Sequence, residues 1–160
     1  MTPSVKDELR KRGIRLEICS EANCASAAAD LTVARCLRSP EAVRAATSLP
    51  LPSGAAERLC EELGAAVQCV AESVRDARHV AVLLTDESLA AVCLLNRHAH
   101  VRAARARSVD EVRQAIRAIG ANVLVIDPGA VTTNQWHVMI QACRKDLPRG
   151  CPPALQAGSV

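Results

Sequence analysis

In the second half of the chain, two patterns of hydrophobic and polar residues follow one another in turn. Short apolar runs, typical of buried strands, are each followed by a longer segment with apolar residues three or four positions apart, which is typical of an amphipathic helix. The predicted strands cover 79–84, 101–104 and 122–126. The predicted helices cover 87–97, 109–119 and 132–145. Such an alternation of strands and helices predicts a parallel sheet that is covered on both faces.

The first half carries a weaker pattern. Residues 14–19 alternate and predict a strand, while the alanine-rich segment 24–38 predicts a helix that Ser39-Pro40 ends. A second, weaker strand is predicted over 41–48. The Pro- and Gly-containing segment 49–54 is predicted to be a loop before a long helix over 55–75.

These elements predict an α/β fold, namely a single Rossmann-like three-layer domain with a mostly parallel sheet of about five strands. The domain is expected to cover residues 14–147. Residues 1–13 form a predicted N-terminal helical extension, in which a charged helix covers 2–12. The segment 148–160 is expected to be an irregular tail, because it holds three prolines and two glycines.

Composition narrows the possible functions. The chain has 160 residues, of which 49% are hydrophobic and 23% charged, as in a globular domain. Trp136 is the only aromatic residue, so a surface that stacks nucleic-acid bases is not expected. The net charge of +3 is mild and does not predict a polyanionic partner. The charged N-terminus and the lack of a spanning apolar run predict a cytoplasmic protein without membrane contact.

The eight cysteines do not predict a metal site. No Cys-x-x-Cys pair occurs, and neither the spacing of Cys19 and Cys24 nor that of His98 and His100 matches a zinc module. In a cytoplasmic protein these thiols are expected to be reduced and to act as small buried hydrophobic groups. We therefore predict neither a metal nor a cofactor.

The turn Thr85-Asp86-Glu87-Ser88 stands at the carboxyl end of a predicted strand, where α/β sheets bind ligands. In one interpretation, Asp86 or Thr85 caps the following helix, and Glu87 interacts favourably with the helix dipole. In the other, Asp86 or Glu87 is a general base. Both interpretations are open from the residues alone.

Two other polar segments lie near predicted strands. Asn96, Arg97, His98 and His100 form a polar cluster, which is either a solvated loop or a binding element. Asp127-Pro128-Gly129 is typical of a plain turn. The sequence has no glycine-rich phosphate loop and no Gly-x-Ser-x-Gly nucleophile motif.

Several of these segments resemble the ribose-5-phosphate isomerase B and galactose-6-phosphate isomerase family. The resemblance rests on strand 80–84, Leu94-Leu95-Asn96-Arg97, Val101-Arg102-Ala103-Ala104 and Ala121-Asn122-Val123-Leu124, with a weaker match at 16–21. It implies a Rossmann-like domain and a dimer with sites between protomers. It also implies cofactor-free isomerisation of a sugar phosphate through an enediol.

The family's functional residues are mostly replaced in this chain. Its catalytic-base cysteine falls on Thr85, and its substrate-binding glycines and threonine fall on Asp86, Glu87, Ser88 and Ala90. The acidic residue of the family's first loop corresponds to another acidic residue here, Glu21. The family's His-Asn pair falls on Ala118 and Ile119. A threonine hydroxyl is no base at neutral pH, and carboxylates in the turn oppose the charge of an enediolate.

Three hypotheses follow. The first is a catalytically degenerate family member that acts as a structural, regulatory or partner subunit, in a homodimer or in a hetero-oligomer with a related isomerase subunit. The second is an active isomerase with a rebuilt site. The third is a module that binds a small ligand or a protein in the same crevice. In the second hypothesis the base would be Glu87 or Asp86, and Glu21 would be a further catalytic residue. The residues that bind the sugar phosphate would be Thr85, Ser88, Asn96, Arg97, His98 and His100.

Overall fold

A computed structural model describes residues 31–145 and 150–156 of the chain. The described residues form a five-stranded parallel sheet with strand order β2-β1-β3-β5-β4. The strands are β1 (Leu31–Cys36), β2 (Ala56–Leu59), β3 (Val80–Thr85), β4 (Ala103–Arg105) and β5 (Val123–Ile126). The predicted Rossmann-like α/β class is confirmed, and every strand pair in this sheet is parallel.

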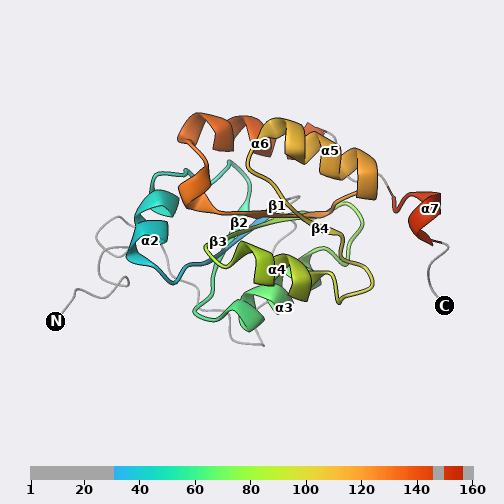
Figure 1. The fold of residues 1–160 in the computed structure, drawn as a ribbon, viewed down its shortest axis with the longest axis horizontal. Helices are drawn as coiled ribbons and strands as arrows, with labels where there is room; N and C mark the ends of the chain where they lie inside the picture. The colour runs from blue at the N-terminus through green and yellow to red at the C-terminus, as the bar shows by residue number, and fades with distance from the viewer. Residues whose placement is uncertain (1–30, 146–149, 157–160) are drawn as a thin grey trace.

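Helices cover both faces of the sheet, as Figure 1 shows, with α5 and α6 on one face and α3 and α4 on the other. The helices are α2 (Pro40–Thr47), α3 (Leu63–Ser73), α4 (Ser88–Leu95), α5 (Val109–Ile119), α6 (Thr133–Lys145) and α7 (Pro153–Gln156). A short 3-10 helix, η1, covers Pro128–Ala130. No helix in the described ranges is long and apolar enough to cross a membrane.

Each face has its own apolar core because strand side chains alternate in direction. Val82 and Leu84 of β3 pack towards α5 and α6, beside the fully buried Trp136. Ala81 and Leu83 pack towards α3 and α4. Strand β3 is buried along its whole length, so it has no solvent-facing side, as is typical of a parallel sheet.

The second half of the fold matches the sequence prediction to within two residues at each element end. Helix α5 begins and ends at the predicted residues because its termini carry strong local signals. Ser108 caps the N-terminus by accepting the Glu111 N–H at 3.3 Å. Gly120 ends the helix in the left-handed conformation, with φ of 62°. Asp127 accepts the Gly129 N–H at 3.0 Å, so the turn predicted over 127–129 is also confirmed.

Three predictions in the first half are wrong. The segment predicted as helix 24–38 contains strand β1, and the segment predicted as strand 41–48 is helix α2. Ser39-Pro40 begins α2 rather than ending a helix, because Ser39 is the N-cap and accepts the Ala42 N–H at 3.2 Å. The helix predicted over 55–75 begins only at Leu63, because Ala56–Leu59 pairs with β1.

A partly buried ion pair helps to hold residues 56–59 in the strand state. Arg35 of β1 contacts Glu57 of β2, with Nε and Oε1 2.8 Å apart and side chains 12% and 21% exposed. The Arg35 guanidinium also donates to the carbonyl oxygens of Ala46 and Leu49, at 2.7 Å and 3.2 Å. These contacts join β2, β1 and the C-terminal end of α2, and they override the helix propensity of the local sequence.

The remaining predictions for the termini lie mostly outside the described residues. These are the helix over 2–12, the strand over 14–19 and the start of the predicted domain. In the tail, α7 is one helical turn inside the segment that was expected to be irregular.

Candidate functional site

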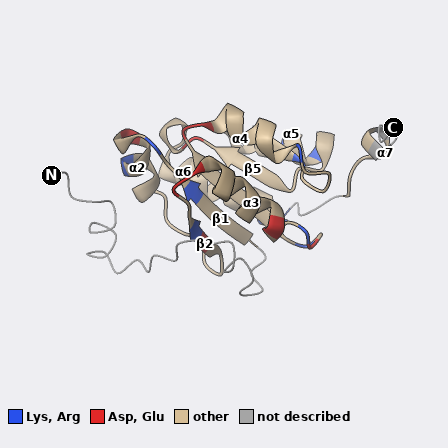
Figure 2. Cartoon of the chain, turned by 90° about the horizontal axis from the view of Figure 1, so that it is seen from below, with Lys and Arg blue, Asp and Glu red and all other residues tan. Residues whose placement is uncertain are grey.

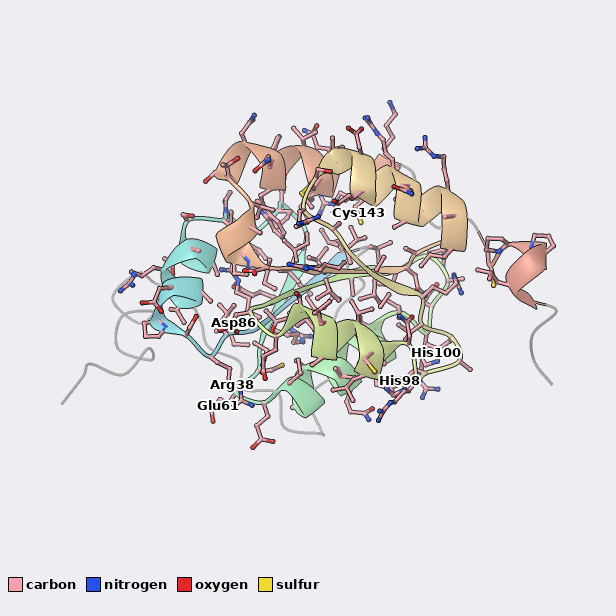
Figure 3. All side chains as sticks on the ribbon, in the orientation of Figure 1. Arg38, Glu61, Asp86, His98, His100 and Cys143 are labelled. Carbon is pink, nitrogen blue, oxygen red and sulfur yellow. The ribbon has the colours of Figure 1, made fainter. Side chains whose placement is uncertain are left out.

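The carboxyl ends of β1, β2 and β3 meet at one end of the sheet. Figure 3 shows Arg38, Glu61 and Asp86 there, each from the segment that follows one of these strands. Ligands of open parallel sheets bind at this end, between strands whose connections leave in opposite directions. In this chain the connection from β1 leads to β2 on one side, while that from β3 leads to β4 at the far edge. The two segments that follow β1 and β3, which we call the crevice, are therefore the candidate site.

Asp86 joins the segment after β3 to the segment after β1 by hydrogen bonds. Its carboxylate accepts the backbone N–H of Ser39 at 2.9 Å and that of Arg38 at 3.1 Å. Partial burial alone would raise the pKa of the Asp86 carboxyl, but hydrogen bonds from Ser39 and Arg38 outweigh it and lower the pKa. The carboxylate therefore occupies the two backbone donors that a bound anion or oxyanion would use.

Glu87 and Thr85 are also engaged by neighbouring groups. Oε2 of Glu87 lies 3.1 Å from Nε of Arg38, and the two side chains are 41% and 57% exposed. Thr85 is fully buried, and its hydroxyl accepts the Glu87 N–H at 3.1 Å. Ser88 is 5% exposed at the first position of α4.

The helix-cap interpretation of this turn needs correction. Asp86 binds the segment that begins α2, not the start of the helix that follows it in sequence. Glu87 is the N-cap of α4, but its side chain makes no capping hydrogen bond. The true partner of Asp86 is 47 positions away in sequence, so local reasoning could not have identified it.

A thiol lies next to Thr85, and the sequence analysis missed it. Cys36 ends β1, is fully buried and stands opposite Thr85 in the strand register. Burial raises the pKa of the Cys36 thiol, with further increases from Glu87, Asp86 and Glu62, while Arg38 acts in the opposite direction. Its position could have been found from the β-branched pair Thr32-Val33, had residues 24–38 not been interpreted as a helix.

The predicted cluster of Asn96, Arg97, His98 and His100 does not join this site. It follows the C-terminal end of α4, whereas Glu87 precedes the N-terminal end. The eight residues of α4 span about 12 Å, and Figure 3 shows the two histidines at the other end of this helix from Asp86. A single cleft that contains Glu87 and His98 is therefore not formed.

Three members of that cluster have structural contacts. The Asn96 amide donates to the carbonyl oxygen of Ala103 at 2.9 Å and accepts the Ala103 N–H at 2.8 Å. Nε2 of His100 lies 2.8 Å from the carbonyl oxygen of Ala71, and its ring meets that of His98 edge to face. These contacts join α4 to β4 and α3 to the loop before β4. Arg97 is exposed at the same end.

The other predicted site residue, Glu21, lies outside the described residues. Among the residues that are described, no group of three or more His, Cys, Asp and Glu side chains could hold a metal ion. The polar groups brought together at the crevice are thus Arg38, Ser39, Asp86 and Glu87, with Cys36 and Thr85 buried beneath them.

Comparisons with solved structures relate this fold to sugar-phosphate isomerases. The chain is similar to ribose 5-phosphate isomerase from Thermotoga maritima, with a TM-score of 0.61 and 18% identity over 79% of this chain and 92% of that one. It is also similar to ribose-5-phosphate isomerase B from Clostridium thermocellum, with a TM-score of 0.61 and 15% identity over 80% and 92% of the two chains.

A third similar structure is ribose-5-phosphate isomerase B from Mycoplasma genitalium with bound ribulose-5-phosphate. Its TM-score is 0.57, with 11% identity over 81% of this chain and 93% of the other. No family model matches the sequence, and no curated protein matches it either. The three similarities show that the chain has the fold of these isomerases.

Proposed function

We propose that this chain is a catalytically degenerate relative of ribose-5-phosphate isomerase B that acts as a structural or regulatory subunit. The observation that carries the proposal is the Asp86 carboxylate on the Ser39 and Arg38 N–H groups. Isomerisation through an enediolate needs donors for a developing negative charge. Here a negative side chain of the protein already holds the donors at the crevice, and Thr85 stands where the resemblance implies a cysteine base.

The surface of α4 supports a role in assembly. Its eight residues, Ser-Leu-Ala-Ala-Val-Cys-Leu-Leu, include no charged side chain, and Figure 2 shows none along its ribbon. A helix that is apolar on all sides is normally buried on all sides. In this chain Ala91 and Leu95 face the core, but Leu89 is 73% exposed and Ala90 and Cys93 are exposed beside it. We propose that this outer face contacts a partner subunit, either a second copy or a related isomerase subunit.

The activity half of the proposal is tested with the purified chain and ribose 5-phosphate. The expected result is no conversion to ribulose 5-phosphate above the rate without protein, measured alongside an active isomerase B as positive control. Turnover that disappears in Glu87→Gln would contradict the proposal. It would support the alternative, an isomerase with a rebuilt site, which is favoured only by the exposure of Glu87 beside Arg38.

The assembly half is tested by light scattering on a sizing column. We expect a mass above the 17.0 kDa of one chain, alone or after mixing with an active isomerase B, and a return to 17.0 kDa in Leu89→Lys. Val138→Lys is the matched control, because Val138 is an exposed apolar residue of α6 on the opposite face. If Leu89→Lys and the wild type have the same mass in every mixture, α4 does not mediate assembly.

A further inference from the structure

Cys36 and Cys60 lie at the carboxyl ends of the neighbouring strands β1 and β2, beside the candidate site. The register pairs Arg35 of β1 with Leu59 of β2, and the Cys60 N–H donates to the Arg35 carbonyl oxygen at 2.9 Å. Cys36 is the last residue of β1, and Cys60 is the first residue after β2, so each follows one member of that pair. Cys36 in turn stands opposite Thr85. A row of Cys60, Cys36 and Thr85 therefore crosses the sheet just below the turn that holds Asp86.

The two side chains lie on the same face of the sheet. Cys36 belongs to the apolar cluster between the sheet and helices α3 and α4, and Cys60 packs against that cluster. Neighbouring strands are about 4.8 Å apart. This separation falls within the range of roughly 4.4–6.8 Å between the Cα atoms of a disulfide. Both cysteines are present as thiols.

We infer that Cys36 and Cys60 form a redox-sensitive dithiol that closes to a disulfide when the protein meets a peroxide. Cys60 is partly exposed, whereas Cys36 is fully buried, so the oxidant reaches Cys60 first. The Cys60 sulfur attacks the peroxide O–O bond, which gives a sulfenic acid and water. The Cys36 sulfur then attacks the Cys60 sulfur and forms the S–S bond as the S–O bond of the sulfenic acid breaks. The proton of the Cys36 thiol leaves with the hydroxide as a second water.

The geometry favours a reversible bond over a permanent one. Parallel strands hold facing Cβ atoms about as far apart as their Cα atoms, whereas a disulfide needs roughly 3.5–4.5 Å between its Cβ atoms. Closing the bond therefore draws the ends of β1 and β2 together and strains both. Strained disulfides are reduced more readily, which suits a switch. Because Arg38 follows Cys36 by two residues, the bond would also move the segment that Asp86 binds.

The test is peptide mapping of the purified wild-type chain after hydrogen peroxide, with free thiols blocked before digestion. Cleavage after arginine and glutamate separates Cys60 from Cys69, because Glu61 and Glu62 lie between them. We expect a Cys36–Cys60 peptide, lighter by two hydrogens than its reduced parts, in the monomer fraction. A thiol reductant should restore both alkylatable cysteines.

Two variants make the result specific. Cys60→Ala should abolish the crosslink and leave Cys36 alkylatable after denaturation. Cys143→Ala is the control, because Cys143 is a buried thiol on the opposite face of the sheet, and it should leave the crosslink unchanged. The inference is overturned if oxidised wild type shows only a sulfinic Cys60, only chains linked through the exposed Cys93, or a Cys60 disulfide to another cysteine.

Discussion

Replacing Asp86 with alanine should destabilise the fold more than the same change at Glu87, the other carboxylate of the turn at residues 85–88. The substitution removes two hydrogen bonds between segments that lie 47 and 48 positions apart in sequence. A hydrogen bond to a charged group contributes about 1.5–3 kcal/mol. The Arg38 N–H is exposed and can bind water instead, whereas the Ser39 N–H is partly buried.

We expect the free energy of unfolding to fall by about 2 kcal/mol, since solvent screens the partly exposed carboxylate. For a chain of this length, the melting temperature should fall by roughly 4–8 °C. Asp86→Asn keeps one acceptor oxygen and should lose about half as much.

The loss should depend on pH in a defined direction. The folded protein lowers the pKa of the Asp86 carboxyl, so the ionised form is the one that folding favours. Its contribution is therefore fully present above the ordinary carboxyl pKa of about 3.9 and is lost as the pH falls through the lower folded value. The difference between the wild type and Asp86→Ala should shrink over that range.

Urea unfolding, followed by the fluorescence of Trp136, measures both effects. Glu87→Ala is the matched control, because its exposed ion pair with Arg38 should contribute only about 0.2–1 kcal/mol. If Asp86→Ala costs no more than Glu87→Ala at pH 7, the reasoning about the closed crevice is refuted. A difference that persists unchanged at low pH would refute the assignment of the effect to the ionised carboxylate.

Three further predictions concern the scaffold. Glu57→Ala should lower the free energy of unfolding by about 1–3 kcal/mol, because it removes the ion-pair partner of the partly buried Arg35, and the double variant with Arg35→Met should recover part of the loss in urea unfolding. Asn96→Ala should lower the free energy of unfolding by about 1–3 kcal/mol in thermal unfolding, because it removes both hydrogen bonds to Ala103. A loss no larger than that of an alanine substitution at an exposed position without such hydrogen bonds would contradict the structural role of Asn96. Trp136, which is 1% exposed, should emit at short wavelength when folded and shift to longer wavelength in urea, and an unshifted spectrum would place the indole in water.

An element of this fold could be predicted from the sequence when the contacts that determine it are made between residues close together in the chain. Helix α5 was located to the residue because Ser108 and Gly120 act on neighbouring backbone groups. The strand state of Glu57 depends on Arg35, which lies more than twenty positions away, and local propensity favoured a helix instead. Ser39-Pro40 carries a local signal as well, but the same dipeptide is compatible with the end of one helix and the start of another.

In the candidate site too, local features could be predicted from the sequence, whereas contacts between distant segments could not. The turn at Thr85–Ser88 was placed correctly at a strand end, because the apolar run before it predicts that strand. The contact of Asp86 with Ser39 was not predicted, since it needs the register of β1 against β3. Asn96 has polar chemistry that suits a ligand, and only its hydrogen bonds to Ala103 show a structural role.

The two outer strands limit how the protein can aggregate or assemble. Within the described residues, β4 pairs only with β5 and β2 only with β1, and these strands have three and four residues. Arg105 lies exposed on β4, while Glu57 and Arg58 lie on β2. Short strands with charged side chains resist the addition of a strand from another molecule, so amyloid-like edge-to-edge growth is disfavoured. Within the described residues, the outer edges of β2 and β4 are therefore poor sites for adding a strand, and the exposed helix surfaces offer more apolar area for a contact.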